Sequence, residues 1–141
     1  VFVAWNGHNF DFKHLDRHIA RYCPDFLDIW NSIFKLDLLY WADKKGNAVL
    51  PGRTNKLEAV SSALGYTRND TDLTGREVGE KYRTWMRNRA PENELDWEDH
   101  KIYCEHDVRA LAVIYRAIDE AEMPALDGNS KGQKQQSLMD F

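Results

Sequence analysis

Two aspartates have the residue type and the sequence setting of metal-binding carboxylates. Asp11 follows the apolar residues 1–5 and the turn residues Asn6 and Gly7, whereas Asp107 lies near the other end of the chain. Carboxylate oxygens are ligands that Mg²⁺ favours in proteins. Two carboxylates so distant in sequence can bind one cation only if the fold brings them together. A third group of carboxylates is needed to complete such a site, and the sequence does not show one.

Asp11 is predicted to lie where a strand ends and a helix begins. The apolar residues that follow recur at helical spacing: Phe12, Leu15, Ile19 and Tyr22. At a helix N-terminus, the dipole and the free backbone N–H groups favour an ionised carboxylate. Asn6 and Gly7 also suit a hairpin turn, but a hairpin needs a returning strand and a helical pattern follows instead. A role for Asp11 as a helix cap alone remains an alternative.

Asp107 is predicted to face the interior from a long helix. Tyr103 stands four residues earlier, so the two side chains share a helix face. The same stripe continues through Leu111, Ile114 and Ile118. A buried carboxylate is costly without a partner, so a metal or a hydrogen-bond donor is expected beside it. The alternative is a solvated Asp107 that pairs with Arg109 or Lys101.

Two segments have the pattern of buried strands, residues 1–5 and 34–41, each apolar on both faces. Such strands belong in the middle of a covered, largely parallel sheet. Two strands alone make a marginal sheet with unpaired edges. We therefore expect that further strands complete the sheet and that this sequence is the C-terminal part of a longer protein.

Four helices are predicted, over about residues 11–22, 55–65, 75–89 and 96–123. Asn55 with Glu58 and Thr74 with Glu77 have the spacing of capping boxes at the second and third helix. Gly65 is expected to end the second. Strands that alternate with helices indicate the α/β class.

Composition narrows the class of protein. The 141 residues fit one domain, with 43% hydrophobic and 30% charged residues. No apolar run approaches the ~20 residues that span a bilayer, and no signal peptide is visible. Cys23 and Cys104 lack metal-ligand spacing, so a reducing, cytoplasmic location is expected. A net charge of −4 argues against a large unspecific nucleic-acid surface, but not against an acidic site neutralised by metal ions.

The two aspartate segments resemble the second and third motifs of the DnaQ-like 3′–5′ exonucleases, which have the ribonuclease H fold. The run from Asn6 to Asp11 is similar to the second motif, and the run from Tyr103 to Asp107 to the third. A tyrosine four residues before the last aspartate is typical of the DEDDy branch; the histidine branch has His where this chain has Ile102. Residues 56–66 and 73–82 are also similar to ribonuclease H-like exonucleases. The resemblance covers roughly residues 1–120 and implies a ribonuclease H-like α/β fold without its first strands.

The resemblance implies phosphodiester hydrolysis with two Mg²⁺ or Mn²⁺ ions. Asp107 would be a direct ligand of one ion, Asp11 would help to hold the other, and Tyr103 would orient the attacking water. Asn6 and Phe10 would line the path of the terminal nucleotides, with Phe10 stacking on a base.

The first motif of the family, an Asp-x-Glu on the first strand, has no counterpart in this chain. Asp37, on the second predicted strand, matches an acid often found there, but we do not assign it as a metal ligand. The chain as written is therefore expected to lack a complete metal site.

Three other groups of residues have weaker functional signals. His14 and His18 stand four apart on a helix but have no evident third ligand, so an exposed pair is the preferred interpretation. Trp85 and Trp97 are assigned to the core. A basic run on the third helix fits either a phosphate backbone or a solvated face. It consists of Arg76, Lys81, Arg83, Arg87 and Arg89.

The C-terminus carries a second motif. Gln135, Leu138 and Phe141 fit a Q-x-x-[LIM]-x-x-F pattern that resembles the peptide by which proteins bind PCNA-type sliding clamps. The usual form ends in two aromatics and this one ends in one, and a pattern of three positions also arises by chance. We favour the clamp interpretation. The predicted organisation is an exonuclease domain over residues 1–123, a flexible linker over 124–134 and a clamp-binding peptide over 135–141.

The preferred function is a clamp-recruited, metal-dependent 3′–5′ exonuclease acting on single-stranded DNA ends, in replication or repair. One alternative is a ribonuclease H-like module that binds clamp or nucleic acid without cutting it. Another is an RNA-processing exonuclease of the ribonuclease D type. An upstream Asp-x-Glu distinguishes the first from the second, and substrate preference distinguishes DNA from RNA.

Overall fold

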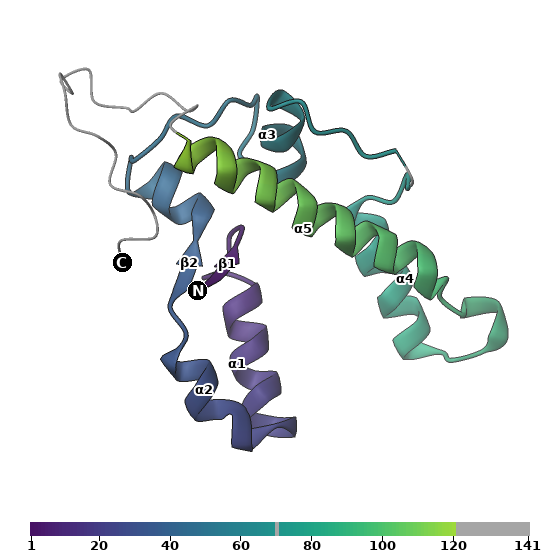
Figure 1. The fold of residues 1–141 in the computed structure, drawn as a ribbon. Coiled ribbons are helices and arrows are strands. Elements are labelled where there is room, and N and C mark those ends of the chain that lie inside the picture. Colours follow the sequence, from purple (N-terminus) through teal and green to yellow (C-terminus); the bar gives the residue numbers. More distant parts are fainter. Residues whose placement is uncertain (70, 121–141) are drawn as a thin grey trace, which may run out of the picture.

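A short parallel sheet lies at the centre of the molecule, where two groups of helices meet (Figure 1). The computed structural model describes residues 1–69 and 71–120. Strand β1 (Phe2–Ala4) pairs with strand β2 (Lys35–Asp37) in parallel, with Val3 opposite Leu36. Both strands were predicted, and their parallel pairing with helices between them agrees with the α/β class.

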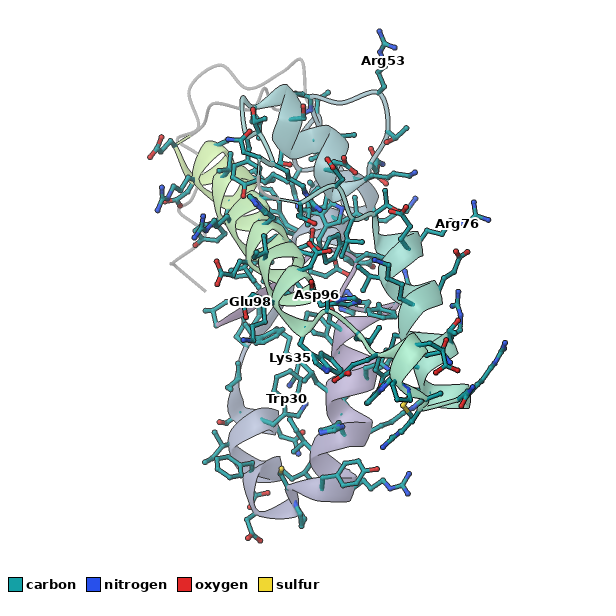
Figure 2. The ribbon with its side chains drawn as sticks, turned by 90° about the vertical axis from the view of Figure 1, so that its right-hand side faces the viewer. Trp30, Lys35, Arg53, Arg76, Asp96 and Glu98 are labelled. Atoms are coloured by element: carbon teal, nitrogen blue, oxygen red, sulfur yellow. The ribbon has the colours of Figure 1, made fainter. Side chains whose placement is uncertain are left out.

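The connection between the strands forms one arm of the molecule. It consists of α1 (Asp11–Tyr22), the 3₁₀ turn η1 (Pro24–Phe26) and α2 (Leu27–Ser32). The bounds of α1 agree with the prediction, whereas α2 was not predicted. Phe12 and Trp30 form a small core with Ala4 of β1. Lys35 packs over the Trp30 ring, with its Nζ 4.3 Å from the ring centre; Figure 2 shows the two residues together.

Strand β2 is shorter than predicted. The apolar residues 38–41 suggested a continuing strand, but the chain turns helical at Leu38 and continues as the π-helical turn η2 (Tyr40–Lys44). The physical reason is the Asp37 carboxylate, which accepts a hydrogen bond from the backbone N–H of Tyr40 at 3.2 Å. Leu38 and Ala42 become fully buried in this way.

Helix α3 (Leu57–Ala63) packs against the long helix α5 (Trp97–Asp119), and together they bury most of the core. Val60 and Ile114 are fully inaccessible at this contact. The predicted capping box of α3 is wrong, because Lys56 is the N-cap and no side chain caps the helix. Gly65 does end it, with a φ of +88° that favours glycine.

Helix α4 (Gly75–Arg87) lies beside the N-terminal half of α5 (Figure 1). Its predicted capping box is confirmed, since the Thr74 side chain accepts from Glu77 N–H and the Glu77 carboxylate accepts from Thr74 N–H. A 3₁₀ turn, η3 (Pro91–Asn93), leads to Asp96, which caps α5. The predicted extension of α5 beyond residue 120 lies outside the described residues, as do the predicted linker and clamp-binding peptide.

One edge of the sheet is open. Among the described residues, β1 pairs with β2 alone, so the backbone groups on its other edge have no strand partner. The expectation that further strands complete the sheet stays a prediction. Over the part of the chain that the structure describes, no helix combines the length and apolar character needed to cross a membrane.

Candidate active site

The turn after β1 is built around the carboxylate of Asp37. Its Oδ1 accepts from the Asn6 N–H at 3.0 Å, and its Oδ2 accepts from the His8 N–H at 2.9 Å. The His8 ring adds a contact of 2.9 Å from Nδ1 to Oδ2. Asp37 is only 4% exposed, so these bonds lie in a site of low dielectric. The carboxylate at the end of β2 thereby fixes the segment that leads into α1.

Asn6 and Gly7 shape this turn in different ways. Asn6 adopts a left-handed φ of 62°, which asparagine tolerates better than most residues. Gly7 is required by close packing, because a Cβ there would lie 2.7 Å from Cζ of Phe12 and 2.8 Å from Cβ of Ala4. No hairpin forms. The turn instead places Asp11 at the first position of α1, as the sequence predicted.

Asp11 is partly buried, and its charge is disfavoured. Burial raises the pKa of Asp11 above its ordinary value of 3.8, and the negative charges of Asp37 and Asp107 raise it further. A hydrogen bond from its own backbone N–H and the nearby His14 oppose the rise without cancelling it. The prediction that the helix N-terminus favours the charged form is therefore outweighed by burial and by two like charges.

Asp107 pairs with an arginine from a distant loop. Arg68 Nη2 hydrogen-bonds Oδ1 of Asp107, and the guanidinium carbon lies 5.0 Å from the centre of the Tyr103 ring. The Arg68 side chain is 14% exposed and that of Asp107 33%, so the pair is shielded from bulk water on one side. The alternative, a pairing of Asp107 with Arg109 or Lys101, is wrong. Those two residues pair with Glu105 and Glu98 along the helix instead.

Tyr103 lies between Arg68, Asp107 and the first turn of α4. Burial and the charge of Asp107 raise the pKa of Tyr103 above its ordinary value of 10.0. The phenol is therefore protonated at neutral pH and can donate a hydrogen bond. A Cβ on Gly75 would lie 3.0 Å from the Tyr103 hydroxyl, so α4 begins directly against this side chain.

Asp11 and Asp107 both line one cleft of about 410 Å³. Residues 2–5 line it along the length of β1, and Leu57 and Leu111 form its apolar wall. Phe10, 61% exposed, stands at the rim. The fold thus brings together two carboxylates from opposite ends of the sequence, beside the open edge of the sheet.

Comparison with known proteins agrees with this geometry. A family model described as the RNase_H superfamily matches residues 1–119. The chain belongs to the RNase_H superfamily. No curated protein and no solved structure matches it. Membership of this superfamily supports a nuclease-type or nucleic-acid-binding function for the chain.

The RNase_H superfamily nucleases usually work with divalent metals. Asp11 and Asp107 share one cleft, and the pKa of Asp11 is raised first by burial and then by the negative charges of Asp37 and Asp107. The oxygens of Asp37 already accept hydrogen bonds from the backbone of the turn before α1. Within residues 1–69 and 71–120, no three side chains of histidine, cysteine, aspartate or glutamate are placed to hold an ion. These residues alone therefore do not make a metal site.

Two features of the site were not predicted. Arg68 lies in a loop, and no periodic pattern links it to α5. Asp37 was noted only as an unassigned acid, but it holds the turn before Asp11.

Three other predictions concern residues that do not line the cleft. Asn6 is exposed and does not line the cleft, and its side chain accepts a bond from Asn9. His14 and His18 are exposed, as predicted. The assignment of Trp85 and Trp97 to the core is wrong, because Trp97 is 48% exposed and Trp85 is half-buried.

Proposed function

We propose that this protein is a metal-dependent 3′–5′ exonuclease that hydrolyses phosphodiester bonds of DNA. The observation that supports it is the meeting of Asp11 and Asp107 in one cleft, with the Tyr103 phenol beside Asp107. Metal-dependent phosphodiester hydrolysis uses converging carboxylates, and a neighbouring donor can orient a water molecule.

Each residue has a role that fits its surroundings. Together with further ligands, Asp11 and Asp107 would supply carboxylate oxygens to a divalent ion, Mg²⁺ or Mn²⁺, which would supply activation of water and stabilisation of the departing oxygen. Tyr103 would donate a hydrogen bond to the attacking water. Phe10 presents an exposed ring at the rim of the cleft, where the last base of a single strand can stack. Asn6 lies on the same turn and faces the solvent.

The remaining ligands are proposed to come from an additional strand. The open edge of β1 runs along the cleft, and an unpaired edge is a template for strand addition. A strand there that carries an Asp-x-Glu would bring two more carboxylates to the end of the sheet where Asp11 lies. The ribonuclease H-like fold would then be complete.

The test is hydrolysis of end-labelled single-stranded DNA and RNA in Mg²⁺ by the native polypeptide. DNA should be shortened from its 3′ end, and Asp107→Asn should reduce the rate by at least ~100-fold, because it removes a charged ligand. Glu105→Gln is the matched control, since Glu105 is exposed on the same helix and pairs with Arg109 at the surface. Wild-type rates in Asp107→Asn would contradict the assignment, and hydrolysis of RNA alone would exclude the DNA substrate.

A second candidate is a module that binds nucleic acid without cutting it. The observation in its favour is that Arg68 already neutralises Asp107. A native polypeptide that binds single strands but shows no Mg²⁺- or Mn²⁺-dependent hydrolysis would establish this alternative.

We also propose that the segment containing Gln135, Leu138 and Phe141, outside the described residues, binds a PCNA-type clamp. The support is the sequence pattern alone. Truncation after Lys134 should abolish clamp binding while hydrolysis of free single strands is unchanged. Undiminished clamp binding by the truncated protein would refute this assignment.

A further inference from the structure

An exposed aromatic patch covers the contact between α4 and the start of α5. We define it by Tyr82, Trp85, Met86, Arg89 and Trp97. Tyr82, Met86 and Trp97 are each close to half exposed, at 46%, 47% and 48%. Large side chains exposed together usually mark a binding surface.

The rings of the patch are held by one another and by a cation. The Trp85 and Trp97 ring centres lie 5.3 Å apart with planes at 89°, and those of Tyr82 and Trp85 lie 6.0 Å apart. The Arg89 guanidinium carbon lies 4.6 Å from the centre of the Trp85 ring. This arrangement keeps the aromatic side chains in place, so little entropy is lost when a ligand stacks on them.

Basic side chains are concentrated on the α4 side of the patch, and acidic ones on the side where α5 begins. Residues 75–89 contain five basic and two acidic residues, whereas residues 90–99 contain five acidic residues and no basic one. Arg83 and Arg87 form no ion pair within the described residues, and Figure 2 shows Arg76 projecting from α4 into solvent. The two acids that flank Trp97 already have partners. Asp96 caps α5, and Glu98 pairs with Lys101 at 2.8 Å.

The patch is connected to the candidate active site by the helices themselves. At one end, α4 begins against the Tyr103 hydroxyl; at the other, Trp85 of α4 contacts Trp97 of α5. Trp97 and Asp107 lie ten residues apart on α5, about 15 Å at 1.5 Å per residue. This distance corresponds to about four nucleotides at the 3.4 Å rise of a stacked strand.

We propose that the aromatic patch binds the single strand upstream of the 3′ end that occupies the cleft. Trp97 and Tyr82 stack on bases, and Arg83 and Arg87 contact phosphates. Aromatic platforms combined with basic residues are the means by which proteins bind single strands without sequence preference. The inference rests on the proposed nuclease function for the position of the 3′ end, but binding at the patch can be measured without hydrolysis.

The experiment measures tryptophan fluorescence and affinity of the full chain in EDTA, with thymidine oligonucleotides of about ten and about three nucleotides. The longer strand should quench the fluorescence, and Trp97→Ala should weaken its binding roughly tenfold. The short strand should bind wild type more weakly than the longer strand does, because it cannot occupy the cleft and the patch together. Phe26→Ala is the control, since Phe26 is 60% exposed at the far end of the molecule and should bind as wild type does.

A second variant tests the phosphate contacts. Arg83→Ala with Arg87→Ala should reduce the slope of log affinity against log salt by about 0.7 per lost contact. Equal affinity of wild type, Trp97→Ala and Tyr82→Ala for the longer strand would overturn the proposal. So would a dimer, seen by sedimentation, that Trp97→Ala dissociates, because the patch would then bind a second copy.

The outcome for the patch is separate from that for the nuclease. If the longer strand binds through Trp97 but metal produces no hydrolysis, the patch assignment stands and the exonuclease proposal fails. If wild type hydrolyses DNA while Trp97→Ala binds it normally, the exonuclease proposal stands and the patch assignment fails.

Discussion

Replacing Asp37 by alanine is expected to destabilise the protein and to loosen the turn that positions Asp11. The carboxylate accepts three backbone hydrogen bonds, from Asn6, His8 and Tyr40, at 3.0, 2.9 and 3.2 Å. Alanine would leave all three N–H groups without this acceptor. Since Asp37 is only 4% exposed, water can replace its oxygens only after the turn rearranges.

The size of the effect follows from these bonds. A hydrogen bond to a charged group contributes about 1.5–3 kcal/mol, and the low end applies because Asn6 and His8 lie at the surface. Three bonds, partly replaced by water, give about 3–4 kcal/mol. For a protein of this size, the loss lowers Tm by roughly 10–15 °C. Asp37→Asn keeps one acceptor oxygen and should cost about half as much.

Thermal and urea unfolding measure this loss, and amide hydrogen exchange locates it. Exchange should accelerate at Asn6, His8 and Tyr40 in Asp37→Ala. Asp43→Ala is the control, because Asp43 is exposed and its pairing with Lys44 contributes little. An Asp37→Ala protein within about 2 °C of wild type in Tm, or no more affected than Asp43→Ala, would refute the reasoning.

Substitutions at four further positions test the same region. Gly7→Ala should cost about 1–3 kcal/mol in urea unfolding, because its Cβ would meet Phe12 at 2.7 Å; unchanged stability would show that the turn can relax. NMR titration should give Asp11 a pKa above 3.8, and this pKa should fall in Asp107→Asn because a like charge is removed. An unchanged pKa would show that the two carboxylates do not interact. A raised carboxyl pKa means that the stability contributed by Asp11 is present below pH 3.8 and lost as pH rises through its folded pKa. Asp11→Asn should therefore be more stable than wild type above that pKa, and a lower stability there would contradict this sign. Arg68→Ala should lower the stability by about 1–2 kcal/mol because Asp107 loses its partner, with Arg68→Lys intermediate; an unaffected Tm in Arg68→Ala would show that the pair contributes nothing.

Local signals in the sequence predicted local structure well. The bounds of α1 and the capping box of Thr74 and Glu77 depend on residues a few positions apart, and both are confirmed. The same kind of signal failed at Asn55 and Glu58, because the chain enters α3 from Lys56 without a side-chain cap. Spacing makes a cap possible, but the path of the preceding loop decides whether it forms.

Specific side-chain contacts that hydrophobic patterns do not reveal account for the other errors. The apolar residues after Asp37 have a strand pattern, but the carboxylate bonds the Tyr40 N–H and the chain turns into a helix. Asp107 was expected to need a partner, and its neighbours on α5 were considered. The actual partner, Arg68, comes from a loop that only the folded chain brings close. Trp97 is exposed because its face of α5 is covered by α4 only at its edge, through Trp85.

We propose that Asp11 and Asp107 act together as one hydrolytic site. The most direct test is the rate of DNA hydrolysis by the native polypeptide, by Asp11→Asn, by Asp107→Asn and by the double variant. Residues that act as a unit give non-additive losses, so the double variant should be no slower than the slower single variant. Losses that multiply in the double variant, or wild-type rates in either single variant, would contradict the account.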